Sequence, residues 1–253
     1  DLIVKLSGDH GTVTIKAGET SATYTAPIQG DDVYLDGGPL SVTIVDASVP
    51  GKVFEDLQLS EDPGVVQIKD TTSEVVATLT VDKTSVVEGG SITYTVTLKG
   101  PEGIAVGNHA PLTFTLSDGS KITVAGDSLT GSITVPVVNN DYVTGPIVTS
   151  ITSVTGDEQF EKLTLNDGTV STTVVDTPDT VTVSIAGNGD VFENANPTFT
   201  VSINKALADD LIVKLSGDHG TVTIKAGQTS ATYTAPIQGD AVYKDGGPLS
   251  VTI

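Results

Sequence analysis

The sequence predicts an all-β protein made of tandem Ig-like, seven-stranded β-sandwich domains of about 105 residues, arranged end to end. Residues 1–44 return at 210–253 with three differences, in which Glu19 becomes Gln228, Asp32 becomes Ala241 and Leu35 becomes Lys244. Apolar residues alternate with Thr and Ser over short runs, as in strands with one wet face. A chain that repeats itself this closely is an array.

A second, fainter repeat sets the length of the unit. SVVEGGSITYTVTL (85–98) aligns with DVFENANPTFTVSI (190–203), and FEKL (160–163) aligns with FEDL (54–57). The units therefore alternate between two types. We expect residues 1–73 to be the C-terminal part of one repeat, 74–178 a complete repeat, and 179–253 the N-terminal part of another, with short boundaries that leave little room for a flexible linker.

The complete repeat is predicted to contain seven strands, from A to G. Their ranges are 76–83, 91–99, 111–117, 120–124, 130–138, 147–154 and 169–176. SDGS (117–120) is typical of a hairpin turn between C and D. On this alignment the first repeat lacks A and B, and the last lacks G. Because the pattern begins in mid-strand, we expect the chain to be a window from a longer protein.

Composition restricts the class of partner. The formal charge is −20 with only twelve basic residues, which argues against binding nucleic acid or anionic membranes. No apolar run is long enough to insert in a membrane. The absence of Cys excludes a disulfide framework. A surface this acidic suits divalent cations, because hard cations prefer carboxylate oxygens.

Strand direction predicts that several acids meet at one end of each repeat. If strand A runs up, the A–B, C–D and E–F loops and the residues after G lie together at the top. In the complete repeat this places four acids at one end, with Asp118 as a possible fifth: Glu88, Asp141, Asp176 and Asp179. The matching acids are Asp31, Asp32 and Asp70 in the first repeat and Glu193 and Asp240 in the last.

These acids predict calcium at the joints between repeats. Several carboxylates at one end would repel one another unless a cation neutralised them, and calcium takes 6–8 oxygens. The bottom of the last repeat adds Asp209 and Asp210 in its B–C loop. The alternative is that these are ordinary solvated loop acids, because turns favour Asp for its own backbone hydrogen bonds.

The residues give little support to catalysis, and we expect no enzyme. His10 and His219 occupy the same GDHG turn, where a solvated histidine is expected, and His109 lies in a Gly/Asn/Pro loop. Paired carboxylates could suggest a glycosidase, but the acids recur in every repeat. The main alternative is a calcium-dependent carbohydrate- or protein-binding module using Tyr34, Tyr142 and Tyr243, which follow the acidic loops.

Four motifs together resemble the extender repeats of giant RTX-type biofilm adhesins of Gram-negative bacteria. They are VVEGGSITYTVTL (86–98), LSDGSKITV (116–124), VTGDEQFEKL (154–163) and VVDTPDT (174–180). SITVPVVNND (132–141) and the Glu of VVEGG also resemble Calx-β domains. The Calx-β resemblance implies calcium ligands at Glu88, Asp141, Asp176 and Asp179. Two departures are the loss of Asp32 at Ala241 and the presence of Ser73 opposite Asp179.

The resemblance implies a secreted protein on the cell surface, exported by a type I system. It also implies a structural extender that holds a distal adhesive region away from the cell, stiffened by calcium between neighbouring repeats. The ligand of such an adhesin is not readable from these residues.

Overall fold

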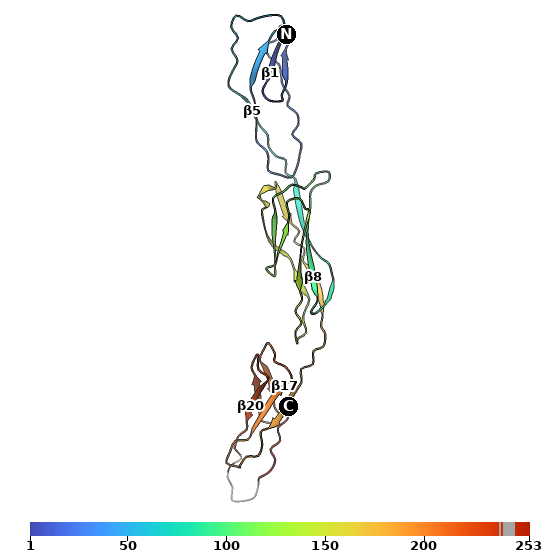
Figure 1. The fold of residues 1–253 in the computed structure, drawn as a ribbon, viewed down its shortest axis with the longest axis vertical. Coiled ribbons are helices and arrows are strands. Elements are labelled where there is room, and N and C mark those ends of the chain that lie inside the picture. Colours follow the sequence, from blue (N-terminus) through green and yellow to red (C-terminus); the bar gives the residue numbers. More distant parts are fainter. Residues whose placement is uncertain (238, 240–245) are drawn as a thin grey trace. The chain divides into compact units, whose positions relative to one another are not determined.

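The computed structural model describes residues 1–237, 239 and 246–253. Regular structure in these residues is β-strand, apart from one short 3-10 helix, so the all-β prediction is confirmed (Figure 1). The chain forms two compact units. One contains Asp1–Val86, Ser91–Pro136 and Pro146–Thr173, and the other contains Val87–Gly90, Val137–Gly145 and Val174–Ile253. The repeat boundaries at 73/74 and 178/179 stay a prediction.

The middle repeat contains all seven predicted strands, each within a few residues of its expected range. Its elements are β6 (Glu74–Val81), β7 (Ser85–Val87), β8 (Ser91–Lys99), β9 (Leu112–Leu116), β10 (Lys121–Val124), β11 (Thr130–Pro136), β12 (Ile147–Thr149), β13 (Ile151–Thr155), η1 (Asp157–Gln159), β14 (Lys162–Leu165) and β15 (Val170–Val175).

These strands form three sheets, with the orders β11-β8-β6-β14, β10-β9-β13 and β12-β15-β7. Predicted strand F is divided at Ser150, because its first part pairs with β15 and its second part pairs with β9. A strand that changes sheets in this way forms a corner of a sandwich. Predicted strand F therefore connects the sheet β12-β15-β7 to the sheet β10-β9-β13.

The core of the middle repeat follows directly from the period-2 pattern. Along β8 the even-numbered residues are buried and the odd-numbered ones are not. Phe114 and Ile122 are fully buried and face each other across the β9–β10 pair. The buried Thr149 hydroxyl donates to the Tyr94 hydroxyl oxygen at 2.9 Å, which satisfies both polar groups inside the core.

Sequence reasoning missed two short strands of the middle repeat. β7 joins the edge of β15, and β14 runs parallel to β6. The β14–β6 pair is held by an ion pair between Lys162 and Glu74, with Nζ and Oε1 2.8 Å apart. That hydrogen-bonded ion pair lowers the pKa of Glu74. Neither strand is long enough to show a clear alternation, and the partner of β14 lies far away in sequence.

The outer repeats hold the remaining strands. The first contains β1 (Leu2–Leu6), β2 (Thr12–Ile15), β3 (Pro39–Val42), β4 (Ile44–Ser48) and β5 (Gly64–Gln67). The last contains β16 (Val183–Gly187), β17 (Thr198–Ile203), β18 (Leu211–Lys214), β19 (Thr221–Ile224) and β20 (Ser230–Thr234).

One identical peptide has different structures in the two outer repeats. SATYT forms β20 at 230–234, where it pairs with β17, but 21–25 form no strand. The sequence from 1 to 73 contains no counterpart of β17. A strand requires hydrogen bonds from a neighbour, so the partner and not the local sequence decides this element.

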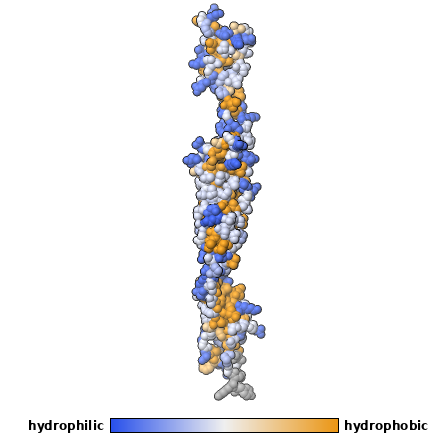
Figure 2. Space-filling view, turned by 90° about the vertical axis from the view of Figure 1, so that its right-hand side faces the viewer, coloured by the Kyte–Doolittle hydropathy of each residue, from blue (hydrophilic) through white to orange (hydrophobic). Residues whose placement is uncertain are grey.

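The surface is mixed in character. In Figure 2 hydrophilic side chains (blue) are interspersed with hydrophobic ones (orange) on the face shown. This is the expected outcome of strands that bury one side and expose Thr, Ser and charged residues on the other. Within the described part of the chain, no helix has the length and apolar composition needed to span a bilayer.

Candidate functional site: acidic loops at two junctions

Two clusters of loops carry most of the predicted acids. The first junction comprises the loops 28–36 and 68–73 together with residues 156–161. The second junction comprises 87–90, 137–145, 174–180 and the residues 204–205 that follow β17. Each junction lies within one compact unit, so its internal geometry can be described by itself.

Glu88 is the central acid of the second junction. It is buried, at 6% exposed, just after β7. Its Oε1 accepts the backbone N–H of Asn140 at 3.0 Å, and its Oε2 accepts that of Thr177 at 3.3 Å. One side chain thus connects the A–B loop, the E–F loop and the residues after strand G. The predicted convergence of these three segments is confirmed.

The other acids of the second junction also have partners. Asp176 Oδ1 accepts the backbone N–H of Thr144 at 2.9 Å. Asp141 and Asp179 both pair with the ammonium of Lys205, the former in very close contact and the latter at 3.7 Å. The hydrogen bond to Asp141 raises the pKa of Lys205, so the ammonium is the stable form. The sequence prediction did not include Lys205.

The first junction contains a pocket of about 260 Å³ with an acidic lining. Its oxygen-bearing side chains include Asp31, Asp32, Asp36, Asp70, Thr71 and Glu161, and Lys69 also lines it. The negative charges of Asp32 and, to a lesser extent, Asp70, together with desolvation, raise the pKa of Asp36 above its usual value. The sequence prediction did not include Asp36. Its counterpart in the last repeat is Asp245, but the middle repeat, on which the predicted ligand set was based, has a shorter loop there.

Local bonds hold these acids in place. Asp31 accepts a hydrogen bond from the Thr71 hydroxyl, and Asp32 Oδ1 accepts the N–H of Tyr34 at 2.7 Å. Glu161 accepts the N–H of Ser73, which is buried. The backbone N–H at position 73, which matches Asp179, thus binds an acid of the middle repeat.

Gly37 leaves space for the carboxylate of Asp70. A Cβ at position 37 would lie 2.7 Å from Asp70 Oδ1, so the Asp70 carboxylate would have to move if this residue had a side chain. The absence of a side chain at this position therefore lets Asp70 approach the 31–36 loop.

An aromatic contact brings Glu161 to this pocket. Tyr34 stacks on Phe160 with ring centroids 5.3 Å apart, and burial raises the pKa of its hydroxyl. The Tyr34 hydroxyl donates to the carbonyl of Gly107 at 2.5 Å. On either side, Leu35 N donates to Gln159 O and Glu161 N donates to Val33 O, both at 3.0 Å. The 33–35 and 159–161 segments therefore pair as a short antiparallel bridge.

The two junctions differ in how well their side chains could bind a metal ion. Among the described residues, no three Asp, Glu or His side chains converge tightly enough to hold an ion as they stand. The first junction nevertheless fits calcium in its donor chemistry, because its pocket presents carboxylate and hydroxyl oxygens whose repulsion raises the pKa of Asp36. The second junction fits it poorly, since Lys205 already pairs with Asp141 and Asp179.

The predicted acids of the last repeat have other surroundings. Asp210 Oδ2 pairs with Lys225 Nζ at 2.7 Å and its Oδ1 accepts the N–H of Ala226 at 2.8 Å; the hydrogen bond from Lys225 lowers the pKa of Asp210. Asp209 is exposed. Asp240, the changed position Ala241, Tyr243 and Lys244 lie outside the described residues.

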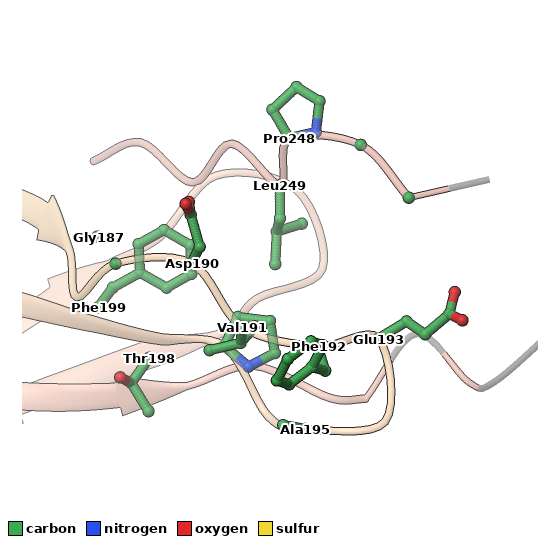
Figure 3. A pocket seen from close by; sticks show the side chains of 14 residues that line it. Gly187, Asp190, Val191, Phe192, Glu193, Ala195, Thr198, Phe199, Pro248 and Leu249 are labelled. Carbon is green, nitrogen blue, oxygen red and sulfur yellow. The ribbon is translucent and has the colours of Figure 1, made fainter. Parts of the chain in front are cut away.

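Glu193 lines a pocket of about 440 Å³ in the last repeat (Figure 3). Val191, Phe192, Phe199 and Leu249 give this pocket an apolar side, and the view shows the Glu193 carboxylate directed away from Phe199. Glu193 is only half-buried, unlike its counterpart Glu88. The pocket is therefore unlike either junction.

Each of the three histidines has hydrogen-bond partners within the fold. His10 and His219 are half-buried, which corrects the prediction of solvated turn residues. Their Nδ1 atoms lie 3.0 Å from the hydroxyl oxygens of Tyr24 and Tyr233 respectively. His109 is buried, and its ring nitrogens lie 2.8 and 2.9 Å from the carbonyl oxygens of Ala110 and Ser128.

The fold and the two junctions define a tandem-repeat, Ig-like β-sandwich protein. The family model described as the LapA domain matches three segments, 1–71, 75–177 and 179–253, which together cover nearly the whole chain. The chain belongs to the LapA domain family, whose repeats are related to a biofilm adhesin. A comparison with curated proteins found no match.

Solved structures offer distant similarities. The adhesin FdeC of Escherichia coli is 15% identical, with a TM-score of 0.23, over 79% of this chain and 66% of FdeC. Domains 4–9 of the surface layer protein SbsC are 14% identical, with a TM-score of 0.23, over 93% of this chain and 48% of that one. Scores this low carry no argument about the arrangement of the repeats.

Proposed function

We propose that this chain is a structural extender segment of a bacterial cell-surface adhesin, with no catalytic role. Its membership of the LapA domain family supports the adhesin context. Export by type I secretion from a Gram-negative cell belongs to the same proposal. The neighbouring repeats of the same chain are then its main partners, and the ligand of the whole adhesin lies elsewhere.

Calcium at the first junction is the second part of the proposal. The observation that carries it is the acidic pocket in which Asp31, Asp32, Asp36 and Asp70 come from the first repeat and Glu161 comes from the middle one. Carboxylate oxygens from both repeats would coordinate a calcium ion there, and its charge would offset the repulsion between these carboxylates. The positive charge of the ion would offset the charge of Asp32, which raises the pKa of Asp36.

The free energy expected from one calcium ion is a sizeable share of the stability of a domain. With millimolar calcium and a dissociation constant of about 10⁻⁵–10⁻⁴ M, one site stabilises the bound state by about 1.4–2.7 kcal/mol. A domain has only about 5–15 kcal/mol of stability in total. Calcium outside the cell would therefore change the stiffness of the first junction without building the fold itself.

Small-angle scattering and thermal unfolding test the proposal together. We expect calcium, compared with a chelator, to raise the melting temperature and to narrow the range of dimensions sampled by the chain. Asp70→Asn should lose most of this response, while Asp82→Asn, at an exposed ion pair with Lys83, should keep it. Unchanged melting and unchanged dimensions in the wild type would reject calcium at this junction.

A glycan array separates the extender from a binding module. The chain exposes Tyr142 at 44% beside the second junction, which is the type of ring that a saccharide could stack on. Selective, calcium-dependent glycan binding that Tyr142→Ala abolishes would favour the binding module. An extender predicts no selective signal.

A further inference from the structure

Lys205 stands where a calcium ion would be expected at the second junction. Its ammonium pairs with Asp141, from the loop after β11, and with Asp179, from the segment after β15. The three side chains are partly shielded, at 34% exposed for Lys205, 20% for Asp141 and 38% for Asp179. One positive charge shared by two carboxylates does locally what a bound cation would do.

The remaining acids of this junction are also satisfied without a metal. Both oxygens of Glu88 accept backbone N–H groups, from Asn140 and Thr177. Asp176 accepts the N–H of Thr144. These hydrogen bonds join the same two segments that Lys205 connects. The junction is therefore held together by backbone N–H groups and by the Lys205 ammonium.

The first junction has a lysine in its pocket lining, Lys69, but not one that pairs with its acids. Among the described residues, none of the pocket carboxylates forms an ion pair with a lysine. The alignment of 85–98 with 190–203 continues to place Gly100 opposite Lys205. A Cβ at Gly100 would lie 2.6 Å from Val106 Cγ2 and 3.2 Å from the carbonyl oxygen of Ile104, so a side chain here would require its neighbours to shift.

We propose that Lys205 is a built-in cation that takes the place of calcium at the second junction, so that this junction closes without the metal. The inference rests on the proposed calcium site at the first junction, because it contrasts a junction that binds calcium with one that does not. A tethered ammonium competes with free calcium through its high effective concentration, because the side chain never diffuses away.

Hydrogen exchange on the full chain tests this inference, with free calcium or a chelator as the only variable. In the wild type we expect calcium to slow exchange in 29–38 and 68–73 and to leave 139–145 and 176–180 unchanged. In Lys205→Ala without calcium, exchange in 139–145 should be about fivefold faster than in the wild type, and calcium should slow it. Lys83→Ala, which removes a lysine paired with Asp82, should behave as the wild type.

The outcomes separate the two proposals. Protection of both junctions by calcium in the wild type would overturn the inference about Lys205 while leaving the proposed function intact. Protection of neither junction in the wild type would overturn the calcium proposal and the contrast that rests on it. Lys205→Ala that exchanges like the wild type without calcium would show that the ammonium does not close the second junction.

Discussion

The contact between Tyr34 and Phe160 gives the sharpest mutational prediction, because the chain contains its own control. Phe160 is 3% exposed and lies in the FEKL motif, whereas Phe54 is 43% exposed and lies in the matching FEDL motif of the first repeat. The two phenylalanines therefore have similar local sequences but different neighbours. Replacing each by Ala measures the value of the contact itself.

The expected magnitudes differ several-fold. Phe160→Ala removes a buried ring and should cost about 3–5 kcal/mol, of which the stacking with Tyr34 contributes about 0.5–1.5 kcal/mol. Phe54→Ala removes a half-exposed ring and should cost about 1 kcal/mol. Only the first substitution should loosen the backbone bridge between 33–35 and 159–161.

Hydrogen exchange resolved by peptide is the suitable assay, because it localises the loss. In Phe160→Ala the amides of Leu35 and Glu161, which are bonded to Gln159 and Val33, should exchange about a hundredfold faster. Phe54→Ala should leave those amides unchanged. Equal effects of the two substitutions on these amides would refute the contact and the junction built on it.

Three further substitutions test separate features. Glu88→Gln places an amide NH₂ against a backbone N–H and should cost about 1–3 kcal/mol in urea unfolding, whereas a cost near zero would mean that the carboxylate does not clamp the loops. Asp36→Asn should raise the melting temperature at neutral pH in chelator, because a raised folded pKa means that Asp36 lowers stability as pH rises through that pKa. The gain should vanish below about pH 4, and a gain that persists at acid pH would contradict the repulsion from Asp32. Thr149→Val leaves the buried Tyr94 hydroxyl without its partner and should cost about 1–3 kcal/mol, against little change for the exposed Thr152→Val.

The site was only partly predictable from sequence. Counting strand directions was enough to predict that Glu88, the 139–141 loop and the 176–177 segment lie at one end, because successive strands run in opposite directions regardless of their side chains. It did not reveal Lys205 as a member of the second junction. Lys205 reaches this junction from the last repeat, and no spacing within one repeat encodes such a contact.

Internal repetition and period-2 alternation determined by themselves that this chain is all-β, that it repeats, and where the seven strands of the middle repeat lie. These are local properties, since a strand buries every second side chain. Tertiary structure alone decided that SATYT is a strand at 230–234 and not at 21–25, because β17 supplies the hydrogen bonds in one place only. It also decided which junction has a lysine paired with two of its acids and which has a pocket whose carboxylates form no ion pair among the described residues, because these charges meet only after the chain has folded.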